Sequence, residues 1–188
     1  GSSLGYRPLR MAIAAHLAEA RGLNCSPGQI IVTNGAQQGL DLCARVLVDS
    51  GDLVCLENPG YFGSRAAFAS IGASLACCEV DEHGLVPNRQ LRPRAICLSP
   101  NHQFPLGVTM PLARRLELLE WASQADSWVI EDDYDSELRY SSRPLEPLLN
   151  LQHDGRVLYL GSFSKIMFPS LRLGFLIGPE ALKEAFMG

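Results

Sequence analysis

The sequence contains no long apolar run, no signal-peptide pattern in its first residues and no excess of positive charge. No hydrophobic stretch among its 188 residues reaches the roughly 18 residues of a membrane-spanning helix. No basic segment followed by an apolar one opens the chain, so the pattern of a signal peptide is missing as well. The formal net charge is −4, which argues against nucleic-acid binding by this segment. We therefore expect a cytoplasmic protein without a membrane partner.

Metal-binding patterns are missing too. The cysteines show no C-x-x-C spacing, and the four histidines are scattered along the chain. Most cysteines lie within apolar runs, which predicts that they serve as small buried hydrophobic side chains in a reducing compartment. The six cysteines are Cys25, Cys43, Cys55, Cys77, Cys78 and Cys97. We therefore expect no metal site.

The sequence does contain a regular alternation of short apolar strands and helical patterns. Hydrophobic and charged residues make up 47% and 19% of the chain, as in soluble globular domains. The strand patterns cover residues 29–33, 53–57, 74–80, 95–99, 127–130, 157–160 and 171–177, and the helical patterns cover 8–21, 35–48, 61–71, 110–125 and the residues after 179. This alternation predicts a single α/β domain with three layers (α/β/α), in which helices cover both faces of a mainly parallel sheet.

Polar stretches directly follow several of these strands. In open parallel sheets, ligands bind beyond the carboxyl ends of the strands, which meet at one edge. The stretches are Asn34–Gln37, Asn58–Tyr61, Pro100–Gly107 and Glu131–Tyr134, and Lys165 lies beyond a fifth strand. Their convergence predicts a binding site at this edge.

The segment Gly161–Gly174 has the residue types of a cofactor site. Lys165 is one of only two lysines, against fourteen arginines. Burial among strands lowers the pKa of an amine, and an uncharged amine can form a Schiff base with a carbonyl. The hydroxyls of Ser162 and Ser164 and the guanidinium of Arg172 suit a phosphate. Together these groups match the aldehyde and phosphate ends of pyridoxal 5'-phosphate (PLP), whereas a surface lysine in a loop is the alternative.

Two other stretches each have a binding and a plain structural interpretation. The turn Asn34–Gln38 joins a strand to a helix, where free backbone N–H groups suit a phosphate. A simple helix cap by Asn34 is the alternative. Tyr61 follows a strand end, where its ring can stack on a flat cofactor or pack in the core.

The acidic run Glu131–Asp135 directly follows an apolar strand. At least one carboxylate should therefore point into the edge of the sheet, where a buried carboxylate needs a cationic partner. The pyridine nitrogen of PLP is such a partner, and a carboxylate there lets the ring act as an electron sink. Strand alternation alone does not choose between Asp132 and Asp133. Tyr134 is placed to donate to the phenolate oxygen of the cofactor.

These motifs, in this order, resemble those of the fold type I aminotransferase superfamily. More narrowly, they resemble the aminotransferase-like domain of MocR-type transcriptional regulators of the GntR family. The resemblance covers essentially the whole chain. Its motifs are Asn34-Gly35-Ala36-Gln37-Gln38, Glu57-Asn58-Pro59-Gly60-Tyr61, His102-Gln103-Phe104-Pro105-Leu106-Gly107, Glu131-Asp132-Asp133-Tyr134-Asp135-Ser136-Glu137 and Ser162-Phe163-Ser164-Lys165.

The resemblance implies a role for each matching position. Lys165 would form the internal aldimine with PLP, and Asp132 would pair with the pyridine nitrogen. Tyr134 would contact the phenolate oxygen, and Tyr61 would stack on the ring. The positions implied around the phosphate are Gly35, which shapes the turn, and Ala36, Gln37, Ser162, Ser164 and Arg172.

The loop after strand 95–99 departs from the family pattern. Aminotransferases of this type carry Asn-Pro-Thr-Gly there, and the asparagine contacts the ring oxygen. Here Phe104-Pro105-Leu106-Gly107 stands in its place. The contact is therefore lost or passes to Asn101, His102 or Gln103. The His-Gln-Phe-Pro form favours the regulator branch.

The resemblance also implies parts that these residues do not contain. Regulators of this kind have a winged helix-turn-helix before this domain, and fold type I proteins have a small C-terminal domain that grips the substrate carboxylate. We therefore interpret residues 1–188 as the large domain of a longer protein, which would bind DNA only through another domain. A homodimer is also implied, since fold type I sites are completed across a two-fold interface.

Two functions are compatible with these residues. The first is an effector-sensing domain, in which an amino compound exchanges onto PLP held by Lys165 and shifts the arrangement of domains that controls DNA binding. The second is the large domain of a PLP-dependent amino acid aminotransferase, in which Lys165 also moves a proton. The cofactor residues serve both functions, so they do not separate them. We favour the first; a domain that has lost its cofactor is a third interpretation.

Overall fold

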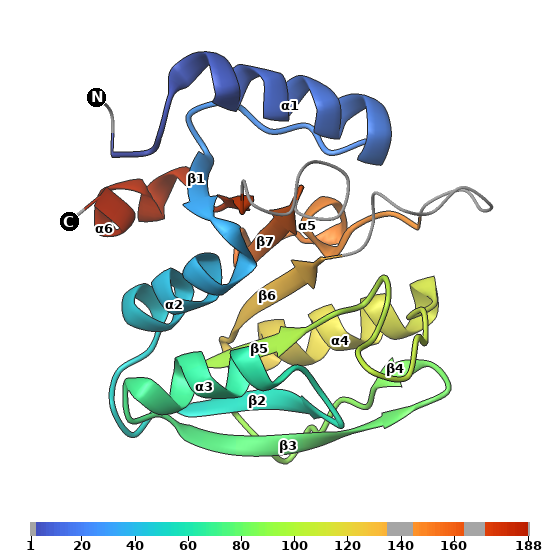
Figure 1. Ribbon diagram of the computed structural model, residues 1–188. Helices are drawn as coiled ribbons and strands as arrows, with labels where there is room; N and C mark the ends of the chain where they lie inside the picture. Colours follow the sequence, from blue (N-terminus) through green and yellow to red (C-terminus); the bar gives the residue numbers. More distant parts are fainter. Residues whose placement is uncertain (1–2, 135–144, 164–171, 188) are drawn as a thin grey trace.

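The computed structural model describes residues 3–134, 145–163 and 172–187, which form one sheet with helices packed around it (Figure 1). The strands are β1 (Ile30–Asn34), β2 (Leu53–Asn58), β3 (Ser74–Asp81), β4 (Gly84–Leu85), β5 (Ala95–Leu98), β6 (Trp128–Asp133), β7 (Val157–Ser162) and β8 (Leu173–Ile177). The helices are α1 (Arg7–Arg21), α2 (Gly35–Leu47), α3 (Phe62–Ser70), α4 (Leu112–Ala125), α5 (Leu148–Leu151), the 3-10 turn η3 (Glu180–Leu182) and α6 (Lys183–Met187). Within these ranges no helix combines the length and apolar character needed to cross a membrane.

The sheet is mainly parallel, as predicted. Its strand order is β1-β8-β7-β6-β5-β2-β3-β4. The strands from β7 through β6, β5 and β2 to β3 pair in parallel. Strand β8 is antiparallel to both of its neighbours, β1 and β7, so β1 runs in the same direction as the parallel set. The carboxyl ends of β1, β2, β5, β6 and β7 therefore lie at one edge of the sheet.

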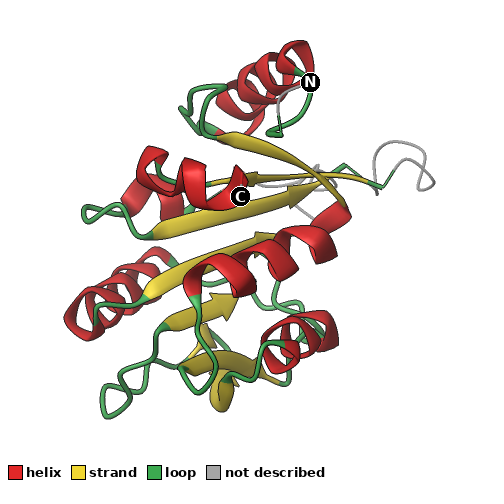
Figure 2. Cartoon of the chain, turned by 90° about the vertical axis from the view of Figure 1, so that its left-hand side faces the viewer, coloured by secondary structure: helices red, strands yellow, loops and turns green. Residues whose placement is uncertain are grey.

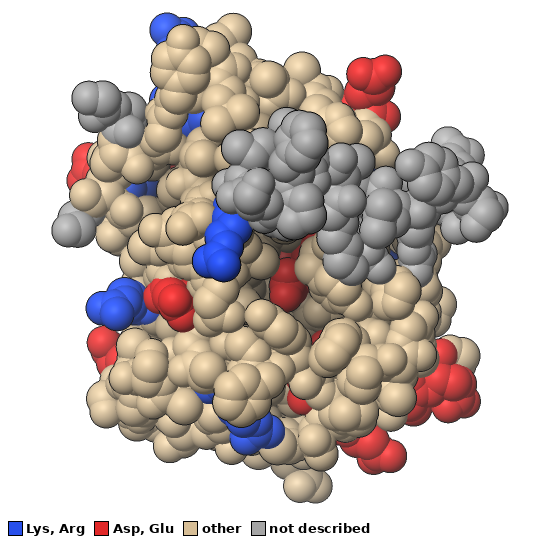
Figure 3. Space-filling model, in the orientation of Figure 1, with Lys and Arg blue, Asp and Glu red and all other residues tan. Residues whose placement is uncertain are grey.

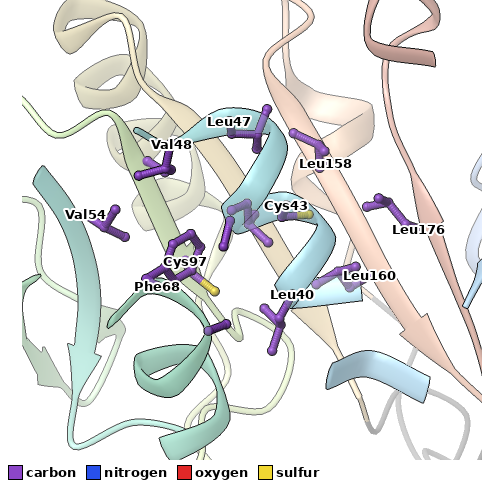
Figure 4. Close-up of a cluster of buried hydrophobic side chains, with 14 of the residues drawn as sticks. Leu40, Cys43, Leu47, Val48, Val54, Phe68, Cys97, Leu158, Leu160 and Leu176 are labelled. Atoms are coloured by element: carbon purple, nitrogen blue, oxygen red, sulfur yellow. The ribbon is translucent and has the colours of Figure 1, made fainter. Parts of the chain in front are cut away.

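Helices cover both faces of the sheet, because successive side chains of a strand point to opposite faces. On one face, α2 and α3 pack against strand residues such as Val54 and Ile130 (Figure 4). Their direct neighbours Cys55 and Val129 point the other way, into a cluster with α4 and α5. Helix α1 covers this second face further along, where it packs against Tyr159. Figure 2 shows the resulting helices on both sides of the strands. The three-layer prediction is confirmed.

The ends of several elements differ from the predicted ones. The helix predicted from residue 110 begins at Leu112, because Pro111 holds an extended conformation just before it. The short helix α5, just before residue 152, lies outside the predicted helical patterns. The two-residue strand β4 was not predicted. The helix expected after Pro179 forms as η3 followed by α6.

The predicted burial of the cysteines holds for most of them but is wrong for Cys77. Cys77 is exposed, and Cys25 is half-buried. Since Cys77 and Cys78 are adjacent in β3, they face opposite sides of the sheet, and only Cys78 lies under the α4 layer. The buried cysteines are Cys43, Cys55, Cys78 and Cys97.

Candidate functional site

Several of the sequence-predicted site residues lie together at the carboxyl edge of the sheet. Leu173, the first residue of β8, pairs with Asn34, the last residue of β1. Arg172 therefore lies beside the turn that begins α2. A methyl group on Gly35 would be 3.7 Å from the carbonyl oxygen of Arg172. In Figure 3, atoms of acidic residues are visible within a hollow in the middle of the view.

The two aspartates at the end of β6 point to opposite faces of the sheet. Oδ2 of Asp133 accepts a hydrogen bond of 2.8 Å from Nη2 of Arg21 in α1 and another from the Tyr159 hydroxyl. Asp132 follows Ile130 by two positions and therefore faces the α2 side. Its Oδ1 is buried and has no hydrogen-bond partner among the described residues. Asp133 thus forms an ion pair with Arg21, whereas Oδ1 of Asp132 has no such partner among the described residues.

The surroundings of Asp132 disfavour its charged form. Asp132 as a whole residue is only 4% exposed. Burial, and secondly the negative charge of Asp133, raise the pKa of Asp132 to about 7. A buried carboxylate is stabilised as an anion by a nearby cation. The adjacent pocket is where such a cation can be placed.

A pocket of about 300 Å³ opens beside Asp132. Its walls, within the described part of the chain, are Ala36, Tyr61, Phe104, Asp132 and Tyr134. The ring of Phe104 lies edge-on to the rings of Tyr61, at 6.2 Å and 89°, and of Tyr134, at 6.5 Å and 83°. Aromatic walls and one buried acid suit a flat ring that carries a protonated nitrogen. These residues fit the ring of PLP.

The turn before α2 has the geometry of an anion site. Gly35 adopts a φ of +77°, which side chains rarely allow. Asn34 makes no side-chain cap to α2, so the alternative of a simple cap is not observed. Thr33 Oγ1 instead donates to the Gly35 carbonyl at 2.9 Å. The first backbone N–H groups of a helix have no partner within it, so they are available to a phosphate.

Tyr61 is not a core residue. It is 42% exposed and occupies the position before α3, which excludes the interpretation that it packs in the core. Its hydroxyl donates to Oε1 of Gln37 at 3.5 Å. The structure thereby brings the predicted stacking ring and a predicted phosphate residue into contact.

The remaining predicted residues are only partly described. Tyr134 is half-buried, and its ring is tilted by 59° against that of His102 at 6.1 Å. Ser162 ends β7 opposite Gly174. Ser164 and Lys165 lie outside the described residues. No group of three or more metal-ligating side chains occurs in the described ranges.

Comparison with known proteins assigns the family. The sequence profile described as "Aminotransferase class I and II" matches residues 1–188. The chain belongs to the aminotransferase class I and II family. The similarity to one regulator and to two aminotransferases of known structure is given below as sequence identity, coverage and TM-score.

One curated relative is the probable rhizopine catabolism regulatory protein MocR of Rhizobium meliloti. It is 44% identical over 184 residues, which cover 97% of this chain and 37% of that protein. An archaeal alanine:glyoxylate aminotransferase has a TM-score of 0.93 and 34% identity over 100% of this chain and 49% of its own. The kynurenine aminotransferase of Pyrococcus horikoshii, solved in complex with PMP, has a TM-score of 0.90 and 34% identity over the same shares. The chain thus spans less than half the length of each.

The loop after β5 is where this member of the family departs from the aminotransferase pattern. Gln103 is 1% exposed. Its Nε2 donates to the carbonyls of Pro59 at 2.8 Å and Phe104 at 2.7 Å. Its Oε1 accepts from the Leu106 N–H at 3.1 Å. Since both amide hydrogens are used, Gln103 holds the loop and has no donor left for a ring oxygen. Phe104 is the loop residue that lines the pocket.

Sequence reasoning missed Arg115, which organises the support of this loop. Arg115 is fully buried and donates to the carbonyls of Met110 and Pro100 and to Oδ1 of Asn101. Its guanidinium also lies 3.9 Å from Glu131. No signal in the sequence distinguishes it from its neighbour Arg114, so only the fold identifies the buried one. The Nδ2 of Asn101 remains buried without a partner in the described ranges.

A second hollow of about 320 Å³ lies at the opposite edge of the sheet. It is lined by residues of α4, by Ser127 and Val129, and by residues of the segment 151–157 that include Gln152 and Arg156. These polar groups already have partners: the Ser127 hydroxyl donates to Pro93, Gln152 accepts from Val157, and Arg156 pairs with Asp126. This hollow adjoins the amino ends of β6 and β7, whereas ligands of open parallel sheets bind at the carboxyl ends. We therefore place the candidate site in the pocket beside Asp132.

Proposed function

We propose that the chain binds PLP in the pocket beside Asp132. The observation that carries this proposal is the buried Oδ1 of Asp132, which has no partner in the described residues and adjoins an aromatic-walled pocket. A protonated ring nitrogen would supply the missing cation. The related kynurenine aminotransferase, solved with PMP, supports the choice of cofactor. The residues that would hold it are Gly35, Ala36, Gln37, Tyr61, Asp132, Tyr134, Ser162, Ser164, Lys165 and Arg172.

Each part of the chain would contribute one property to this site. Asp132 would keep a proton on the ring nitrogen, because a buried anion stabilises a neighbouring cation. Tyr61 would cover the ring, and Tyr134 would donate to its oxygen. The first N–H groups of α2 and the guanidinium of Arg172 would hold the phosphate. When bound, PLP supplies an electron sink for a carbon that carries an amino group.

We infer that the domain containing this site is the effector-sensing domain of a transcriptional regulator. Identity to the regulator MocR is 44%, against 34% to each of the two aminotransferases. The family asparagine that contacts the ring oxygen is replaced by Phe104, which fits a site under less demand for turnover. An amino compound that binds at the cofactor would favour one arrangement of the domains. DNA would be bound by another part of the full-length protein.

The alternative function is the large domain of an amino acid aminotransferase. The TM-score of 0.93 to an alanine:glyoxylate aminotransferase favours it, because the whole described sheet superimposes on an enzyme. Lys165 would then also move a proton between the substrate carbon and the cofactor. We expect a homodimer under either function, and size determination of the full-length protein as a strict monomer would contradict this expectation.

The full-length protein separates the two functions. A panel of amino acids and amines is added to the PLP-loaded protein while DNA binding and keto-acid formation are both measured. For a regulator we expect one amino compound to change DNA affinity by about 5- to 150-fold, with no sustained keto-acid formation. Multiple turnovers without specific DNA binding would establish the aminotransferase instead. A protein that takes up no PLP would contradict both.

A further inference from the structure

Gly63, the second residue of α3, lies where two candidate site residues meet. A methyl group built on its α carbon would be 2.2 Å from Cε1 of Tyr61 and 2.3 Å from Oε1 of Gln37. Both distances are far inside normal contact. The bare α carbon is therefore what lets the Tyr61 ring and the Gln37 amide occupy their present positions.

The backbone of Gly63 takes part in the same arrangement. Nε2 of Gln37 donates to the Gly63 carbonyl at 3.2 Å. Oε1 of the same amide accepts from the Tyr61 hydroxyl at 3.5 Å. The contacts link the start of α2 to the start of α3 through Gln37. Tyr61 also forms one wall of the pocket, and Ala36, next to Gln37, forms another.

We propose that Gly63 is a positioning residue, which holds Tyr61 over the pocket and Gln37 beside the Gly35 turn as a coupled pair. This inference rests on the proposed function, since it assigns these two side chains to one ligand. The ring of the ligand would lie under Tyr61 and its phosphate near Gln37. The absence of a side chain at Gly63 would thus set the distance between the two ends of the ligand site.

The side chains next to Gly63 allow an effect of Gly63→Ala on the site to be distinguished from an effect on stability. Glycine is generally a poorer helix former than alanine, so the helix itself does not oppose alanine at position 63. The atoms that the added methyl group would meet belong to the ends of two exposed side chains, which can rotate away. Gly39 provides the contrast, because its methyl group would lie 2.6 Å from the buried Leu160. Alanine at Gly63 should therefore disturb the site, whereas alanine at Gly39 should disturb the core.

The test compares Gly63→Ala with Gly178→Ala in the full-length protein. A methyl group at Gly178 would be 3.6 Å from its nearest neighbour, an ordinary contact, so this variant is the matched control. PLP affinity is measured by titration of the visible absorption, and the melting temperature is measured on the cofactor-free protein. We expect Gly63→Ala to bind PLP about tenfold more weakly, with a melting temperature equal to or above that of the wild type. Gly178→Ala should match the wild type in PLP affinity.

A double-mutant cycle shows whether Gly63 acts through Tyr61. In a Tyr61→Ala background there is no ring to displace, so adding Gly63→Ala should lower PLP affinity much less than it does in the wild type. Equal losses in the two backgrounds would overturn the proposal. So would a Gly63→Ala variant that binds PLP like the wild type, or one that melts at a lower temperature, which would show a packing role. A wild type that binds no PLP would overturn the proposed function as well, whereas the other outcomes concern Gly63 alone.

Discussion

Arg21 at the end of α1 donates to Asp133 at the end of β6, across 112 residues of sequence. Both side chains are buried, with exposed fractions of 3% and 1%. The contact decides which of two adjacent aspartates is neutralised within the protein. Asp133 is paired on the α1 face, and the alternation of side chains along β6 puts Asp132 on the α2 face, where it adjoins the pocket with one oxygen still unpartnered in the described residues.

Replacing Arg21 should destabilise the fold strongly. In Arg21→Met the carboxylate of Asp133 loses its cation while it remains buried, which typically costs about 3–5 kcal/mol. Denaturant unfolding of the cofactor-free protein measures the change. The matched control is Arg89→Met, since Arg89 forms an ion pair with Glu120 in which the side chains are 45% and 59% exposed. That variant should change the free energy of unfolding much less than Arg21→Met does, because solvent screens an exposed ion pair. Equal effects of the two variants would show that burial of the Arg21 pair has no energetic consequence.

The stability of the cofactor-free protein should depend on pH through Asp132. Its pKa is raised from 3.8 to about 7, so between these values the folded state holds a proton that the unfolded state has lost. The free energy of unfolding of the wild type should therefore fall as pH rises from 3.8 to about 7, relative to Asp132→Asn, by about 1.4 kcal/mol for each unit of raised pKa.

Comparison with Asp132→Asn removes most of the contribution of the other buried acids, although the charge of Asp132 is itself a lesser cause of the raised pKa of Glu57. Burial also raises the pKa of Glu57 and of Glu131 to about 8, but both residues are present in the wild type and in the variant. Unfolding curves measured at several pH values give the difference directly. Parallel pH profiles for the two proteins would mean that Asp132 titrates normally and is not a desolvated acid.

Phe104 should contribute to ligand binding more than to folding. Phe104→Leu removes one aromatic wall of the pocket, and the contact of an aromatic ring with a flat ligand is worth roughly 0.5–1.5 kcal/mol beyond burial. PLP affinity, measured by titration, should fall about two- to tenfold. The melting temperature should change little, because Phe104 is 44% exposed. Leu106→Ala is the control, since Leu106 is 52% exposed on the same loop and is not among the pocket walls. Equal PLP affinity of Phe104→Leu and the wild type would remove Phe104 from the site.

Local patterns were sufficient for the order of most elements and for the edge of the sheet at which the candidate site was sought. Apart from the two-residue β4, each described strand and long helix has its own periodicity, and parallel strands place their carboxyl ends together whatever the partners are. The choice between Asp132 and Asp133 could not be predicted in this way. It depends on which helix covers which face, and the residue that decides it, Arg21, is 112 positions away.

Which individual charged residues are buried could not be predicted from the sequence either. Arg114 and Arg115 are adjacent, yet only Arg115 is fully buried, with its guanidinium donating to several backbone carbonyls. The role of Gln103 as an anchor of its loop depends on the Pro59 carbonyl, which is contributed by a different strand end. Such contacts are set by tertiary packing, so no local pattern reports them. The roles of Ser164 and Lys165 rest on the sequence motif alone and remain proposals.

The central claim is that Lys165 and the pocket beside Asp132 form a PLP site. The most direct test is the visible absorption of the full-length protein during titration with PLP, compared for the wild type, Lys165→Ala and Lys183→Ala. Lys183 is the other lysine of the chain and pairs with Glu180, which makes it the matched control. We expect the wild type and Lys183→Ala to develop the absorption band of lysine-bound PLP, and Lys165→Ala to stay folded without it. A wild type without this band, or a Lys165→Ala variant that retains it, would contradict the account.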